Sequence, residues 1–200
     1  MSALTAELAA AAARLVVEDG MEYAEAKRKA ARAFGARVEM PRNEEVEDEV
    51  RRYLALFCAE TQPLELRALR RLALRWMVRL AAFRPYLGGA AWRGTATRLS
   101  CLRLDLYCDD SKAIEIALIN QGIAYDADSL PEPRGRRRGE PVGLLTLADN
   151  CPELGEPVTL HMTVRDFDEL RGALKPDAQG RTWRGDAHAL RRLLDEESAP

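Results

Sequence analysis

The stretch Ala91–Asp128, AWRGTATRLSCLRLDLYCDDSKAIEIALINQGIAYDAD, decides the expected fold. Residues 91–97 and 101–107 alternate between apolar and polar side chains, which is typical of strands with one buried face. Residues 110–121 have helical spacing after an Asp-Asp-Ser start, and residues 123–127 predict a third strand. The sequence therefore predicts strand, strand, helix and strand in close succession.

The chain before this stretch has the spacing of helices. Apolar residues recur at every third or fourth position, which is typical of a helix with one buried side. Four helices are expected: one over 3–18, one over 21–34, one that begins at Asn43 as its N-cap, and one over 63–84. Gly88 and Gly89 follow them and are interpreted as a turn. The expected division is a helical region, 1–86, and a mixed-sheet domain, 87–200, which together form one compact unit with helix 63–84 belonging to its core.

Beyond the central stretch, residues 142–148 and 157–164 alternate as strands around Gly155 and predict a hairpin. A loop over 130–140, a short helix over 167–174 and a last helix over 186–196 complete the expectation. The predicted fold class is α/β of the α+β type: helices on a mixed sheet of about five strands, a common sheet size.

Composition limits the classes of function. Hydrophobic residues make up 47% of the 200 residues, which is enough for a folded core, and the net charge of −2 does not indicate a nucleic-acid binder. No apolar run approaches the roughly 20 residues that span a bilayer, and the start lacks a basic signal region. We expect a cytoplasmic protein that does not enter the membrane. Four cysteines without a CxxC pair, and two histidines, do not favour a zinc site.

Two motifs lie in the central stretch. Gly94 and Thr95 form a small pair on the first expected strand, and Asp105 lies in Leu102-Arg103-Leu104-Asp105-Leu106 on the second. Together with the element order over 63–128, these motifs resemble the core of the DNA polymerase β-like nucleotidyltransferase superfamily. That superfamily carries a small residue pair at the end of its first strand and a hydrophobic–Asp–hydrophobic–Asp/Glu pattern on the next.

The resemblance implies a nucleotide site and a metal site. Nucleotidyl transfer uses two divalent cations about 4 Å apart, which hard carboxylate oxygens hold. The implied cofactor is Mg²⁺, with Asp105 and Asp126 as catalytic and metal-binding residues and Asp128 as the alternative to Asp126. The implied nucleotide-binding residues are Arg93, Gly94, Thr95, Arg98 and Arg103.

The motif is incomplete. Carboxylates two positions apart on a strand share a face, but Arg103 and Tyr107 occupy the two positions that would pair with Asp105. Two interpretations stay open at this point. The protein binds a nucleotide with Mg²⁺ and transfers its nucleotidyl group to a protein, an RNA or a small molecule. Alternatively, it is a non-catalytic binding module on the same scaffold, with RNA or an acidic protein as partner.

A basic patch on the expected helix 63–84 supports the second interpretation. Arginines recur every four residues and so share one side of the helix: Arg67, Arg71, Arg75 and Arg79. A solvated face balanced by nearby acids is the alternative interpretation. A third hypothesis makes residues 1–60 a helical oligomerisation unit.

Overall fold

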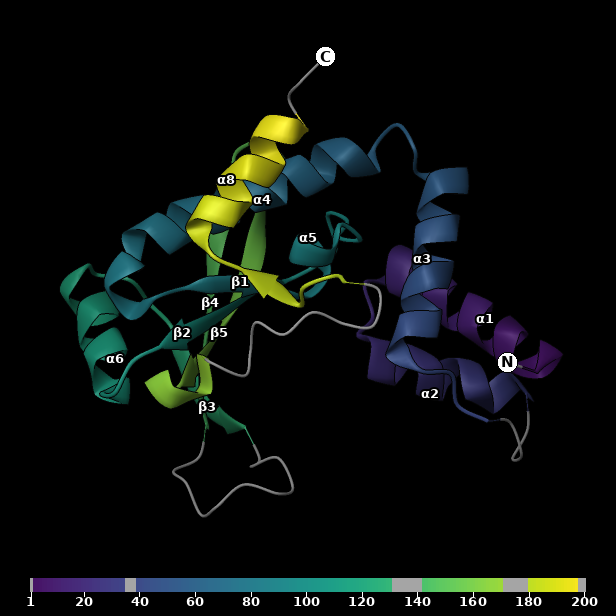
Figure 1. Ribbon diagram of the computed structural model, residues 1–200, viewed down its shortest axis with the longest axis horizontal. Helices are drawn as coiled ribbons and strands as arrows, with labels where there is room; N and C mark the ends of the chain where they lie inside the picture. Colours follow the sequence, from purple (N-terminus) through teal and green to yellow (C-terminus); the bar gives the residue numbers. More distant parts are fainter. Residues whose placement is uncertain (1, 35–38, 131–141, 171–179, 198–200) are drawn as a thin grey trace. The chain divides into compact units, whose positions relative to one another are not determined.

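The structure is a computed structural model that describes residues 2–34, 39–130, 142–170 and 180–197 (Figure 1). Internal contacts divide the chain into two compact units. Unit 1 comprises Met1–Leu66 and Thr95–Leu99, and unit 2 comprises Arg67–Gly94 and Ser100–Pro200. The prediction of an α+β protein with a mixed sheet is confirmed. The units divide within a helix, whereas the sequence suggested a division near residue 86.

Unit 1 is a group of helices around a small apolar core. Its helices are α1 (Ala3–Asp19), α2 (Tyr23–Phe34), α3 (Asn43–Phe57) and the first turn of α4 (Gln62–Arg79). Helix α1 packs against both α2 and α3. The alanines of α1 at the core allow the helix backbones to approach closely. The buried core residues are Leu8, Ala9, Ala12, Ala13, Val17, Ala26, Ala30, Val46, Val50 and Leu54.

Local capping explains where these helices begin and end. The Ser2 hydroxyl accepts a hydrogen bond from the Thr5 amide at 3.1 Å at the start of α1. Gly20 ends α1 in the left-handed conformation, with φ of 66°. The expected cap at Asn43 is wrong by one position: Arg42 is the N-cap of α3, and the Glu45 carboxylate accepts its backbone N–H at 2.7 Å.

The segment Thr95–Leu99 belongs to unit 1 and is not a strand. The Gln62 side chain donates to the Ala96 carbonyl at 2.9 Å, and the Arg98 backbone donates to the Glu65 carboxylate at 2.9 Å. The predicted strand 91–97 is therefore wrong. Its first residues form the short helix α5 (Gly89–Arg93), which two left-handed glycines bracket, Gly89 with φ of 64° and Gly94 with φ of 81°.

Unit 2 contains one six-stranded mixed sheet in the described part of the chain. Strands β2 and β5 are parallel, and the other neighbouring pairs are antiparallel. The strand order is β3-β4-β5-β2-β1-β6. The bounds are β1 (Tyr86–Gly88), β2 (Leu102–Tyr107), β3 (Asp126–Leu130), β4 (Val142–Cys151), β5 (Glu156–Arg165) and β6 (Arg184–Gly185). Within the described part of unit 2, the remaining helices are η1 (Ala81–Phe83), α6 (Ser111–Asn120), η2 (Phe167–Glu169) and α8 (Ala187–Glu196).

Most strand predictions agree with these bounds. The expected strand 101–107 and the expected hairpin are β2 and the pair β4–β5. The expected strand 123–127 begins three residues later, as β3. Helix 63–84 ends at Arg79 and is followed by η1. Most of the loop 130–140, and the end of the helix expected over 167–174, lie outside the described residues.

The two faces of the sheet differ. Register places Leu87, Leu104, Met162 and Leu145 side by side on four adjacent strands, and all four are at most 3% exposed. Helix α4 covers this apolar face. The indole N–H of Trp76, a residue of α4, donates a hydrogen bond to the Asp149 carboxylate of β4 at 2.8 Å. The end of α8 meets α4, since Arg67 and Arg70 of α4 both contact Glu197. The opposite face carries the alternate residues of each strand, which are mostly polar.

Gly185 of β6 is closely covered by an aromatic ring. A Cβ atom placed there would lie 2.0 Å from the Trp92 ring, whereas one at Gly143 would lie 3.7 Å from its nearest neighbour, Val164. We expect Gly185→Ala to lower the free energy of unfolding of unit 2 by about 3 kcal/mol, because the ring must move. Gly143→Ala is the matched control and should change it by less than about 0.5 kcal/mol. Urea unfolding of both variants checks this prediction. Equal unfolding midpoints for the two variants would contradict the close packing of Trp92 on Gly185.

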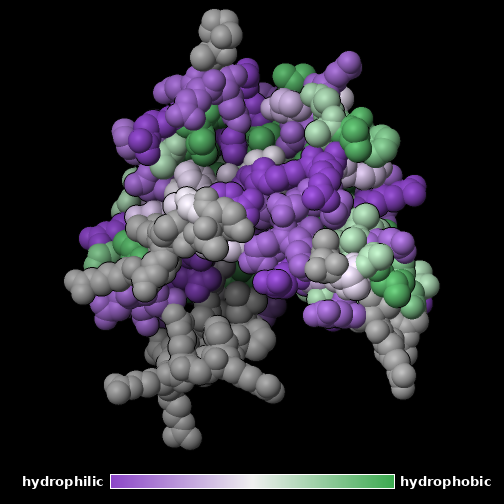
Figure 2. Space-filling view, turned by 45° about the vertical axis from the view of Figure 1, so that its right-hand side comes forward, coloured by the Kyte–Doolittle hydropathy of each residue, from purple (hydrophilic) through white to green (hydrophobic). Residues whose placement is uncertain are grey.

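Apolar side chains on the surface are scattered. The face of the molecule in Figure 2 is mainly hydrophilic, with hydrophobic residues in separate patches. In unit 1 the most exposed of them are Leu56, Phe57 and Leu64, at 76%, 70% and 65%. No helix in the described ranges combines the length and the apolar character needed to cross a membrane.

Candidate functional site

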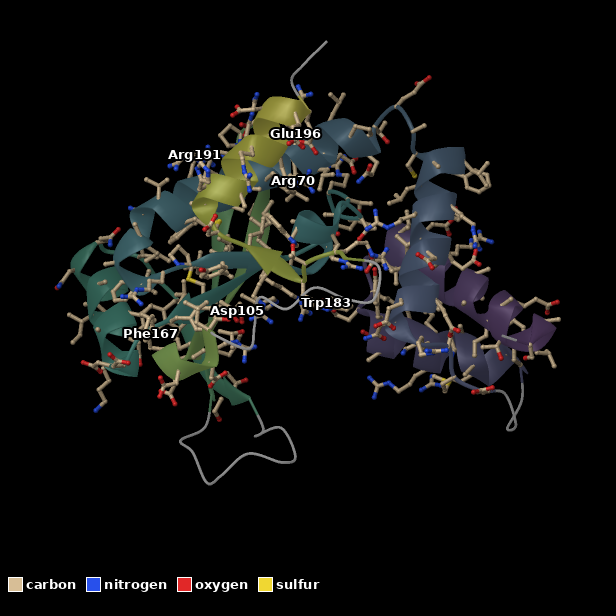
Figure 3. All side chains as sticks on the ribbon, viewed as in Figure 1. Arg70, Asp105, Phe167, Trp183, Arg191 and Glu196 are labelled. Atoms are coloured by element: carbon tan, nitrogen blue, oxygen red, sulfur yellow. The ribbon has the colours of Figure 1, made fainter. Side chains whose placement is uncertain are left out.

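Asp105 lies in the polar face of the sheet, between strands on both sides. Tyr86 of β1 and Thr163 of β5 are its register neighbours. Its Oδ1 accepts a hydrogen bond from Nε of Arg165 at 2.6 Å, and its Oδ2 lies 2.7 Å from Nη1 of Arg184. The Asp105 side chain is only 14% exposed. Both carboxylate oxygens are thus held by guanidinium groups. Figure 3 labels Asp105 on the sheet.

The two arginines extend this contact into a network. Arg165, at the end of β5, also reaches the Glu169 carboxylate of η2 at 3.4 Å. Burial lowers the pKa of the Arg165 guanidinium, but the hydrogen bond and charge of Asp105 outweigh burial and raise that pKa above its usual value. Arg184 also donates to the Tyr107 hydroxyl at 2.7 Å. Charge-assisted hydrogen bonds of this kind are the strong ones, so the network holds β2, β5 and β6 together.

Arg103 precedes Asp105 by two residues and shares its face. It is exposed, and its register neighbours are Gly88 on β1 and His161 on β5. The stem of Arg103 lies over Gly89, where an added Cβ would be 3.1 Å from the Arg103 Cδ. The glycine pair therefore leaves room for an arginine. Gly88 and Gly89 lie at the end of β1, where the sequence predicted only a turn.

The predicted nucleotide-binding residues are divided between the two units. Gly94 ends α5, while Thr95 and Arg98 belong to unit 1. Arg93 is 9% exposed, and its guanidinium lies over the Trp183 ring at 4.4 Å. Of that set, Arg103 alone is placed in register with the face around Asp105.

Asp105 and Asp126 do not form a metal site. Asp126 lies on the edge strand β3, and β4 and β5 separate it from β2. Because neighbouring strands are about 4.8 Å apart, the two acids are roughly 14 Å apart across the sheet, too far for one ion. Among the described residues, no group of three or more His, Cys, Asp or Glu side chains could hold a metal. The donor set therefore does not fit the Mg²⁺ that the resemblance implied.

The basic patch on α4 is largely engaged inside unit 2. Arg67 donates to the Glu197 carbonyl, Arg75 to the Asn150 carbonyl at 3.4 Å, and Arg79 to the Gln121 side chain at 2.6 Å. Arg79 also stacks on Trp76. Arg71 is exposed. The four arginines share one side of the helix, as expected, and three of them contribute hydrogen bonds to the fold.

Sequence reasoning did not find Arg165 and Arg184. Arg165 follows the predicted strand 157–164 by one residue, and the alternation of that strand would have placed Arg165 on the polar face. Arg184 lies in a two-residue strand, which is too short for any periodic signal. A scan against models of protein families finds no match for this chain, and a search of curated proteins finds no similar sequence.

Proposed function

We propose that unit 2 is a nucleotidyltransferase-like scaffold that binds the phosphate groups of a nucleotide without metal-dependent transfer. The observation that carries the proposal is the state of Asp105, whose two oxygens are both in ion pairs with arginines. A carboxylate held in this way is not available as a ligand for a cation. The position two residues before it is an arginine, which repels cations and attracts phosphate.

The charge around Asp105 favours an anionic ligand. Three arginines lie on one face of the sheet: Arg103, Arg165 and Arg184. The carboxylates in this network are those of Asp105 and Glu169. Asp105 fixes the directions of two of these guanidiniums, and a fixed guanidinium loses less entropy when it binds. Gly88, opposite Arg103, has no side chain to cover the face. These features support binding of phosphate by arginine alone.

Calorimetry with each nucleoside triphosphate, in EDTA and then in Mg²⁺, tests the proposal. We expect binding in EDTA, with Mg²⁺ weakening it because the cation neutralises the phosphates. Arg103→Glu should weaken binding by at least about tenfold, the effect of losing one charge-assisted contact. Arg71→Glu is the matched control, since it makes the same charge change on the exposed side of α4 and should leave affinity within about twofold.

Three results would contradict the proposal. One is binding that appears only with Mg²⁺, another is release of pyrophosphate during incubation with a nucleotide, and the third is equal affinity of the Arg103→Glu and Arg71→Glu variants. The first two would restore the metal-dependent interpretation of the sequence. The third would place any nucleotide elsewhere.

A further inference from the structure

A second candidate site lies in unit 2, outside the network around Asp105. A cavity of about 270 Å³ opens between the end of α4, the start of β1 and the start of α8. Met77, Ala81 and Pro85 form its apolar wall, and Arg84, Tyr86 and Asp186 are polar residues that line it. One water needs about 10–15 Å³ of such volume, so the cavity has room for a small organic molecule.

Arg84 is held in an unusual conformation at this cavity. Its φ of 45° is left-handed, and within the described ranges no other residue except glycine has a positive φ. Its guanidinium lies 3.9 Å from the centre of the Phe167 ring. Non-glycine residues persist in this conformation when their surroundings fix them, and such residues concentrate at ligand sites. Here the surroundings are the end of η1, where the Arg84 backbone N–H donates to the Ala81 carbonyl at 3.2 Å and fixes Arg84 at the wall of the cavity.

Asp186 supplies the opposite charge. One of its carboxylate oxygens accepts a hydrogen bond from the Ala189 amide at 2.8 Å and so caps α8. Burial raises the pKa of the Tyr86 hydroxyl, Asp186 raises it further, and Arg84 lowers it. Both charges therefore act on a single hydroxyl group. The cavity presents a cation, an anion, a hydroxyl, the imidazole of His188 and an apolar wall.

We propose that this cavity binds a small zwitterion with an apolar body, of the chemical class of a free aliphatic amino acid. The carboxylate of the ligand faces Arg84, its ammonium faces Asp186, and its aliphatic group packs on Met77 and Pro85. A simple carboxylic acid is a poorer match because Asp186 repels it. A simple amine is poorer because Arg84 repels it.

Calorimetry on the full chain with three probes tests this: L-leucine, 4-methylpentanoate without the ammonium, and 3-methylbutylamine without the carboxylate. We expect leucine to bind at least about tenfold more tightly than either single-charge probe. Asp186→Asn keeps a capping side chain, since asparagine is also a favoured N-cap, and should lower the affinity for leucine to that for 4-methylpentanoate. Asp195→Asn, on the exposed side of the same helix, is the matched control and should bind leucine as the wild type does.

Arg84→Gly separates a binding role from a purely structural one. Glycine adopts the left-handed conformation freely, so this variant should unfold no more easily than Arg84→Ala. It should nevertheless lose selectivity for leucine over 3-methylbutylamine. Absence of leucine binding to the wild type, or unchanged binding in both Arg84→Gly and Asp186→Asn, would overturn the proposal.

Discussion

Replacing Arg70 with methionine is expected to destabilise unit 2 by about 4 kcal/mol, the largest effect of any single change considered. Arg70 lies on α4, with its side chain only 6% exposed. Its guanidinium donates to the carbonyls of Ala91 and Trp92, at 2.9 and 3.1 Å, and forms an ion pair with Glu197. Figure 3 places Arg70 near α8. One side chain thus joins α4, α5 and the end of α8.

The size of the effect follows from what methionine leaves behind. Methionine fills much of the volume but donates no hydrogen bond, so two carbonyls near the end of α5 lose their partner. Glu197 loses its counterion as well. Breaking one side of a buried pair costs about 3 to 5 kcal/mol. The Glu197 side chain is 28% exposed, so water compensates in part for its lost partner, and the two carbonyls supply the rest of the expected effect.

Urea unfolding followed by tryptophan fluorescence measures this change directly. The three tryptophans, Trp76, Trp92 and Trp183, all lie in unit 2. Arg71→Met is the matched control, because the next residue along α4 is exposed and should tolerate the change within about 0.5 kcal/mol. Equal unfolding midpoints for the two variants would show that the contacts of Arg70 add nothing to stability.

Asp105→Asn is expected to lower the free energy of unfolding of unit 2 by about 3 kcal/mol. The amide preserves the shape of the side chain but removes the charge between Arg165 and Arg184. Those guanidiniums are 27% and 20% exposed, so water compensates only in part for the lost carboxylate. The repulsion between the two arginines is then no longer offset.

Asp126→Asn is the control for this prediction. The resemblance gave Asp105 and Asp126 the same role, but Asp126 is exposed on the edge strand β3. Its substitution should change stability by less than about 0.5 kcal/mol. If a catalytic metal site were built from both acids, removing either one would relieve repulsion between carboxylates and raise stability. A stabilised Asp105→Asn variant would therefore contradict the ion-pair network.

The sequence predicted the elements with strong periodicity and missed those set by longer-range packing. Alternation in β2 and helical spacing in α4 were reliable because each buries a continuous apolar face. Residues 91–97 misled because polar Arg93, Thr95 and Thr97 alternate in the sequence with less polar residues, as in a strand. In the structure Thr95, Ala96 and Thr97 are all buried, and Gly89 and Gly94 allow a helical turn. The resemblance located Asp105, but it did not reveal the two arginines that hold it. Those partners lie 60 and 79 residues further along the chain, beyond the reach of a local pattern.

The most direct test is a titration with Mn²⁺ in place of Mg²⁺, followed through the backbone amide signals of β2 by nuclear magnetic resonance. Mn²⁺ broadens the signals of nearby nuclei and prefers the same oxygen ligands as Mg²⁺. Because the Asp105 carboxylate is held by Arg165 and Arg184, we expect no selective broadening of residues 103–107 when Mn²⁺ is added without nucleotide. Selective broadening of those residues in the wild type, abolished by Asp105→Asn, would show that Asp105 binds a metal and would contradict this account.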